Sequence, residues 1–258
     1  MKRKDIIFCL VIIILFFTIR RLPIDVLFHS GKFDAHAKDF KAIIMAIVIT
    51  GGSYWVARKF NLTGKGGFSG HERKNYWMLL LPLIFPGIMF GVNIEITCFD
   101  DFSAVLIFFS VFLFKGLVEE TVFRGVIQGY LLKNYPKRSY HFSCFLSASL
   151  FAVCHLTNLE YTVSYNVIIQ VIYAFFMGLL FSALLIRTNN VWLLGLVHGL
   201  LNSIVTGCET NNHLMSGTGT TSTFFEYVIQ MLGVTLIFSP MLFVYWMLIK
   251  TIPKSYHN

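Results

Sequence analysis

The sequence has few charged residues and none of the short motifs that mark the common hydrolases. Only 13% of its 258 residues are charged, about half the share that is typical of a soluble domain. Neither GxSxG nor HExxH occurs, so a serine hydrolase and a zincin are without support. No basic run carries interleaved aromatic residues outside the apolar segments. This pattern disfavours nucleic-acid binding.

Two features of secreted proteins are also missing. The sequence has 5 cysteines and no CxxC pair, so it predicts neither a disulfide framework nor a thiolate metal site. The apolar N-terminal run 6–19 lacks a small-x-small cleavage site and is followed by Arg20 and Arg21. We therefore expect this run to be a retained first membrane span rather than a cleaved signal peptide.

Apolar residues, in contrast, make up 56% of the chain, and 27 of them are phenylalanine. One soluble core of this size could not hide so much apolar surface, whereas a bilayer accommodates it. The sequence therefore predicts an all-α, polytopic membrane helix bundle of about eight transmembrane helices, forming a single integral membrane domain over residues 1–258. The fourth span is long and is expected to be one tilted or kinked helix. The predicted spans are 5–22, 41–58, 76–93, 103–133, 141–156, 164–187, 190–206 and 224–250.

The distribution of lysine and arginine predicts the orientation of this bundle. With a cytoplasmic N-terminus, most of these residues fall in inner segments, beginning with Lys2, Arg3 and Lys4, and three of the four outer loops contain none. Both termini are therefore expected to be cytoplasmic. The glycine-rich segment 60–75 lacks the spacing of a phosphate-binding loop and is expected to be a flexible cytoplasmic loop.

Three of the apolar segments carry ionisable or amide side chains deep in a predicted span. Such side chains cost roughly 2.5–3.5 kcal/mol each on insertion scales, so they need a partner or a function. Glu120 and Arg124 are four residues apart and can pair on one helix face. Glu119 then lies on another face, where Lys115 could contact it. The residues form three motifs, EExxxR, FxxxH and HxxxN: Glu119, Glu120 and Arg124; Phe151 and His155; His198 and Asn202.

Each motif alone has a structural explanation, as ion pairs that lock the bundle, a core histidine, or an interhelical hydrogen-bond pair. Taken together, the three motifs favour a catalytic site over three separate structural roles. A rise of about 1.5 Å per residue puts Glu119 and His155 at about the same depth, roughly 21 Å from the inner end. We expect a carboxylate, two imidazoles and an amide to meet in a water-filled cavity open to the cytoplasm. Such groups could hydrolyse an amide bond with or without a metal ion.

The three motifs, in this order on separate helices, resemble those of the CPBP family. These are the CAAX-protease and bacteriocin-processing intramembrane proteases, also called the Abi family. The resemblance covers about residues 103–206, which would be the catalytic core. It implies an intramembrane endopeptidase of the CAAX prenyl protease type, which hydrolyses peptide bonds of a membrane-associated peptide or protein. It also favours a multi-pass protein of a bacterial plasma membrane.

The resemblance further implies roles for the motif residues. Glu119 would be the catalytic glutamate that activates water together with His155. His198 and Asn202 would form the oxyanion site. The ion pair of the first motif would brace this arrangement: Glu120 and Arg124.

Some alternatives stay open at this stage. A divalent metal such as zinc could be bound through Glu119, His155 and His198, or the glutamate could activate water without a metal. The same scaffold could instead give bacteriocin self-immunity or bind a partner protein without proteolysis. A transporter is disfavoured because no paired halves are seen in the sequence.

Overall fold

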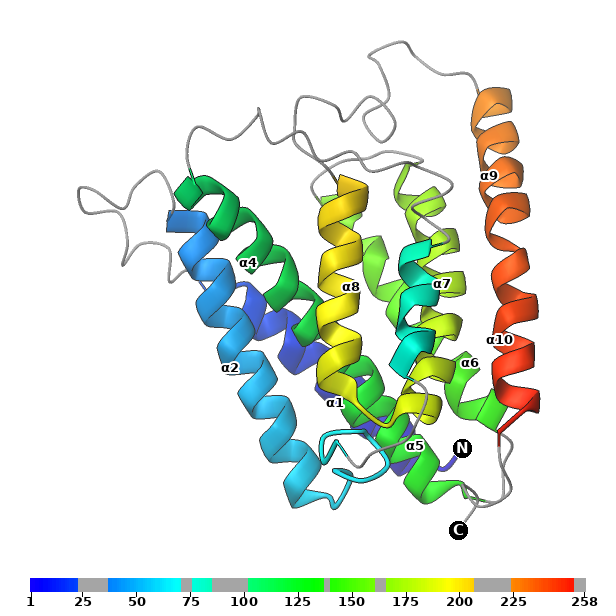
Figure 1. The fold of residues 1–258 in the computed structure, drawn as a ribbon. Helices are drawn as coiled ribbons and strands as arrows, with labels where there is room; N and C mark the ends of the chain where they lie inside the picture. The colour runs from blue at the N-terminus through cyan, green and yellow to red at the C-terminus, as the bar shows by residue number, and fades with distance from the viewer. Residues whose placement is uncertain are drawn as a thin grey trace.

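The computed structural model of the chain describes residues 1–22, 37–70, 76–84, 102–136, 140–160, 166–206 and 224–252. Within these ranges the chain is helical and contains no strand (Figure 1). The elements follow one another as α1 (Arg3–Arg20), α2 (Ala37–Lys59), η3 (Tyr76–Leu80), α4 (Phe102–Glu120), η5 (Thr121–Gln128), α5 (Gly129–Asn134), α6 (Tyr140–Cys154), η6 (His155–Glu160), α7 (Asn166–Thr188), α8 (Val191–Thr206), α9 (Phe224–Phe238) and α10 (Pro240–Lys250).

Four helical stretches in the described part of the chain are long and apolar enough to cross a membrane: Lys38–Lys59, Tyr140–Leu159, Val167–Thr188 and Glu226–Lys250. The predicted fold class, an all-α membrane helix bundle, is thereby confirmed. The last of these stretches is broken at Pro240, which begins α10, a position where the missing N–H of proline is tolerated. The predicted third span, 76–93, lies in part outside the described residues.

The long fourth segment is a continuous but irregular helix. Thr121–Gln128, between α4 and α5, forms a π-helix in which every residue is buried. Segments of π-helix are rare and occur frequently at functional sites. The prediction of one helix over this segment is therefore confirmed, and Glu119 and Glu120 are the last two residues before the π-helical stretch.

Glycines bring α4 and α8 into close contact. A Cβ atom on Gly116 would lie 2.3 Å from the backbone oxygen of Gly195, and one on Gly199 would lie 2.5 Å from the Cα atom of Leu113. Small residues let membrane helices approach this closely. The contact sets the two glutamates of α4 beside the middle of α8.

The segment 60–70, after α2, is packed against the bundle. A Cβ atom on Gly66 would lie 2.1 Å from the backbone oxygen of Gly125 in the π-helix, and Phe68 is buried. The indole nitrogen of Trp192 donates to the backbone oxygen of Phe68 at 3.1 Å. These residues form turns, as expected of a loop, but the loop is packed against the bundle because its glycines allow a close approach of the backbones. Residues 71–75 lie outside the described part.

Helix α7 runs through the interior of the bundle. In the apolar 18-residue stretch of α7, 61% of the residues are buried, against 28–33% in the corresponding stretches of the other three candidate spans. It packs beside α6 and α10 (Figure 1). Its central backbone oxygens, at Gly178 and Ser182, accept hydrogen bonds from polar side chains of the π-helix. Helix α7 therefore packs against the side of the π-helix that carries Arg124 and Gln128.

Candidate active site

Most of the polar residues singled out in the sequence gather in the middle of the bundle. Glu119 and Glu120 end α4, and Arg124 follows in the π-helix. His198 lies halfway along α8. The side chains of Glu120 and Arg124 are fully buried, while Glu119 and His198 are 7% and 6% exposed. These four residues therefore share one nearly dry interior.

Glu120 bridges the two helices of the site. Its Oε2 atom lies 3.2 Å from Nε of Arg124, so the predicted ion pair is present. Its Oε1 atom lies 2.7 Å from Nδ1 of His198. One carboxylate thus holds a cation on its own helix and an imidazole on the facing helix. The short distance to Nδ1 fixes the direction in which the ring of His198 points.

Aromatic rings surround the guanidinium of Arg124. Its Cζ atom lies 4.4 Å from the ring centroid of Phe151 and 6.0 Å from that of Phe181. Its Nη2 atom also donates to the backbone oxygen of Gly178 at 3.3 Å. A buried charge is tolerated when it is paired and bonded in this way. Phe181 stacks on His198 as well, with ring centroids 4.7 Å apart, so the same rings position both residues.

Glu119 faces the other nitrogen of His198. The Nε2 atom of the ring lies 3.6 Å from Oε2 of Glu119. His198 therefore stands between two carboxylates, one on each side of its ring. A gap of 3.6 Å exceeds the length of a direct hydrogen bond and is within the distance of an ion-pair contact.

His155 begins η6, directly after α6, and is half-buried. Its Nδ1 atom lies 3.0 Å from the backbone oxygen of Phe151. A small cavity of about 50 Å³ is lined by both His155 and Glu119. The structure thus brings His155 to the same cavity as Glu119. Asn202 is half-buried on α8, one turn after His198, and does not line this cavity.

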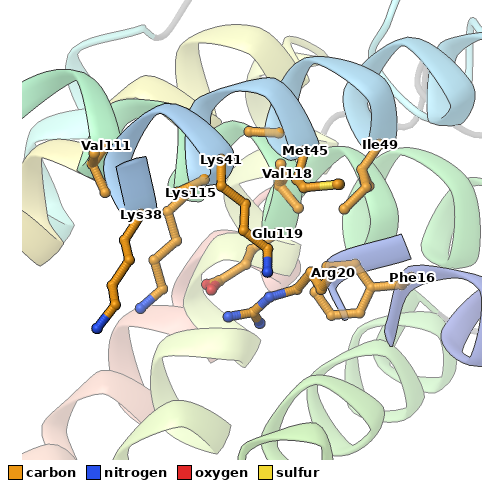
Figure 2. A pocket seen from close by; sticks show the side chains of 12 residues that line it. Phe16, Arg20, Lys38, Lys41, Met45, Ile49, Val111, Lys115, Val118 and Glu119 are labelled. Carbon is orange, nitrogen blue, oxygen red and sulfur yellow. The ribbon is translucent and has the colours of Figure 1, made fainter. Parts of the chain in front are cut away.

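A second, larger cavity of about 300 Å³ adjoins Glu119 (Figure 2). Lys115 lines both cavities, which places it close to Glu119 as the sequence suggested. Lys38 and Lys41, from the beginning of α2, line the larger cavity. Neither their position nor that of Arg20 near Glu119 could be inferred from the sequence, because no local spacing links α1 or α2 to α4.

The larger cavity extends toward the end of the bundle where α2 begins. In Figure 1, α2 begins at the upper end, whereas α1 begins and α10 ends at the lower end. The residues that line it come from the end of α1, the first half of α2 and the second half of α4. It is a different space from the predicted cytoplasmic cavity, which would hold Glu119, His155, His198 and Asn202.

A metal ion would need donors in reach of one another. Glu119, His155 and His198 supply the carboxylate and imidazoles that zinc takes in catalytic sites. Within the described ranges, however, no three His, Cys, Asp or Glu residues are grouped so that they could hold a metal ion. Arg20 and Lys115 also line the cavity shared by Glu119 and His155, and their charges oppose a divalent cation. The residues as arranged do not fit a metal ion.

The fold and the site together define a polytopic, all-α membrane protein with a buried carboxylate–imidazole cluster between two helices. Residues 101–204 match the family model of the Type II CAAX prenyl endopeptidase Rce1-like proteins. This range contains all three motifs, so the match confirms the resemblance to the CAAX-protease family for that part of the chain. The matched family is, by its description, a family of endopeptidases. Comparisons with curated proteins and with solved structures give no match.

Proposed function

We propose that this protein is an intramembrane endopeptidase, similar to CAAX prenyl proteases, in which Glu119 activates the attacking water. The observation that carries the proposal is the contact of His198 with both glutamates, at 2.7 Å and 3.6 Å, within a segment that matches a protease family. The substrate is a peptide bond of a membrane-associated peptide or protein. A bacterial plasma membrane remains the proposed location.

Glu119 and His155 act on the water. The carboxylate of Glu119 takes a proton from the water, whose oxygen adds to the carbonyl carbon of the substrate. His155 donates through Nδ1 to the backbone oxygen of Phe151, and in its neutral form it keeps Nε2 as an acceptor toward the cavity. The second hydrogen of the water can be held there. The two acceptors thus orient the lone pair of the water toward the substrate.

His198 and Asn202 act on the oxyanion. With Nδ1–H held by Glu120, a protonated His198 also donates from Nε2. That donor and the amide of Asn202 stabilise the negative oxygen of the tetrahedral intermediate. The C–N bond then breaks, and the proton held by Glu119 passes to the leaving nitrogen. The products are a carboxylic acid and an amine, so one water is consumed for each bond cleaved.

Cleavage by purified protein in liposomes tests this proposal. The first substrate is a fluorescence-quenched prenylated peptide that ends in a CAAX sequence. A second experiment searches for new peptide termini in membranes of cells that make the protein. Glu119→Gln should lower kcat at least about 100-fold without a change in Tm. Cleavage by Glu119→Gln at the wild-type rate would overturn the proposal.

The non-proteolytic alternative predicts a different outcome for the same variant. Bacteriocin immunity or partner binding that depends only on packing would survive Glu119→Gln, because the substitution keeps the volume of the side chain. Immunity measured beside cleavage therefore separates the two functions.

A further inference from the structure

Two side-chain amides outside the three motifs line the small cavity beside Glu119. Asn158 belongs to η6 and Gln170 to α7, and both line the cavity of about 50 Å³ that His155 and Glu119 share. Each amide lies in a stretch that is apolar and long enough to cross a membrane. Polar groups are costly in such a stretch unless they have hydrogen-bond partners, so this pair needs an explanation.

The two amides bind each other. The Nδ2 atom of Asn158 donates to Oε1 of Gln170 at 2.7 Å. Gln170 also hydrogen-bonds Tyr173, about one turn further along α7. Within the described ranges the side chain of Asn158 makes this one hydrogen bond. Its second amide hydrogen and its carbonyl oxygen therefore stay available, which is the donor and acceptor pattern of a peptide group.

The 3₁₀ conformation of η6 sets Asn158 on the same face as His155. Side chains three residues apart eclipse one another in a 3₁₀-helix, and both of these residues line the cavity. At a rise of about 2.0 Å per residue they lie about 6 Å apart along the helix axis. An extended peptide advances about 3.3 Å per residue. Asn158 is thus spaced to meet a bound peptide about two residues from the bond that His155 and Glu119 attack.

A peptide that is cleaved within the membrane needs partners for its backbone there. Water can attack only where the carbonyl group is accessible, so the peptide has to be unwound around the scissile bond. The N–H and C=O groups next to that bond then lose their helical partners, and such groups are costly to leave unpaired in an apolar layer. A side chain that offers one donor and one acceptor at this position removes that cost.

We propose that Asn158, held by Gln170, binds the backbone of the peptide substrate within two residues of the scissile bond. The proposal rests on the proposed endopeptidase function. Asn158 donates its second amide hydrogen to a backbone carbonyl oxygen and accepts a backbone N–H at Oδ1. Gln170 is a positioning residue that acts through Asn158. This site reads the main chain of the substrate and not its side chains or its terminus.

An ester scan of the substrate tests this proposal. In the fluorescence-quenched prenylated CAAX peptide, the backbone amides within two residues of the scissile bond are replaced by esters one at a time. Each ester lacks the N–H and has a weaker acceptor, and mass spectrometry of the products identifies the bond that is cleaved. The wild-type protein should cleave the parent peptide about fivefold better in kcat/KM than at least one ester, mainly through KM, as expected for the loss of one neutral hydrogen bond.

Two variants should abolish this preference. In Asn158→Leu the ratio of parent to ester should fall to one, and in Gln170→Met it should fall part of the way. Because both peptides are measured on the same preparation, a smaller folded fraction changes both rates alike and leaves the ratio unchanged. No ester sensitivity in the wild-type protein would overturn the proposal. So would a wild-type ratio in Asn158→Leu, which would leave the amide pair as a structural bond between η6 and α7.

Asn134 provides the matched control. It is an exposed amide at the end of α5, donates to the backbone oxygen of Tyr130 at 2.9 Å, and lines neither cavity. Asn134→Leu should keep the wild-type ratio of parent to ester. A fall in this control equal to that in Asn158→Leu would also overturn the proposal, because the effect would then not arise in the cavity.

Binding separates this proposal from the proposed function. The affinity of Glu119→Gln for the same peptide and its esters, each carrying the fluorophore alone, is measured by fluorescence anisotropy with and without Asn158→Leu. Weaker binding of an ester that depends on Asn158, with no cleavage by the wild-type protein, would sustain the backbone site and overturn the endopeptidase. Cleavage without any ester sensitivity would do the reverse. Equal affinity for all peptides, or no binding of any, would overturn the backbone site.

Discussion

The Nδ1 atom of His198 lies 2.7 Å from Oε1 of Glu120, across the glycine-lined contact between α8 and α4. This contact joins the first and third sequence motifs. Because Glu120 also holds Arg124 at 3.2 Å, the orientation of the imidazole depends on an ion pair that is fully buried. A change of Glu120 should therefore affect both the position of the catalytic imidazole and the stability of the protein.

Glu120→Gln should damage both activity and stability. The uncharged amide leaves Arg124 buried without its counter-charge, so the free energy of unfolding should fall by about 3 kcal/mol. The ring of His198 also loses its charged partner, and a misplacement of about 1 Å can lower kcat about 100-fold. Thermal unfolding in detergent and peptide cleavage measure the two effects.

A double variant separates these two effects. Glu120→Gln combined with Arg124→Met removes the unpaired cation and should recover much of the lost stability. It should not recover activity, because His198 still lacks the carboxylate. Recovery of wild-type kcat in the double variant would show that Glu120 serves only the ion pair.

Gly199→Ala should destabilise the site through the contact of α8 with α4. The added Cβ atom would lie 2.5 Å from the Cα atom of Leu113, so the helices must separate. Overpacking of this kind costs about 1–3 kcal/mol, and cleavage should fall as His198 moves away from the glutamates. The matched control is Gly51→Ala in α2, where a Cβ atom meets nothing within 4 Å. A Tm equal to the control would contradict the close contact.

His155→Ala should lower kcat about 100-fold or more while leaving Tm nearly unchanged, because it removes a half-buried acceptor for the water. His141 provides the control. Its side chain is exposed at the start of α6, and its Nδ1 atom lies 2.7 Å from the hydroxyl of Tyr245, away from the cavities at Glu119. His141→Ala should keep wild-type kcat. Equal activity of the two variants would remove His155 from the mechanism.

Metal removal tests the zinc site that the sequence allowed at Glu119, His155 and His198. Since the described residues form no metal-holding group and Arg20 and Lys115 line the same cavity, cleavage should persist after dialysis against a strong chelator. Metal content by mass spectrometry and cleavage are measured on the same sample. Loss of cleavage that is restored by added zinc would establish the metal and require movement of these side chains.

Much of the fold follows from local patterns in the sequence. The long apolar runs predict the helices, and the irregular fourth segment is one continuous helix that contains a π-helical stretch. The packing of the segment 60–70 against the bundle could not be predicted from local patterns. Glycines favour a solvated loop and close backbone packing alike, and only the approach of Gly66 to Gly125 distinguishes the two.

The sequence by itself determined the membrane class, the helical segments and the pairing of Glu120 with Arg124, because helical periodicity places residues four apart on one face. The tertiary structure decided that Glu120 also binds His198, that Glu119 faces the same ring, and that cations from α1 and α2 line a cavity beside Glu119. The physical reason is that helical periodicity fixes neighbours within one helix only. Contacts between helices depend on where small residues such as Gly116 and Gly199 let the backbones meet.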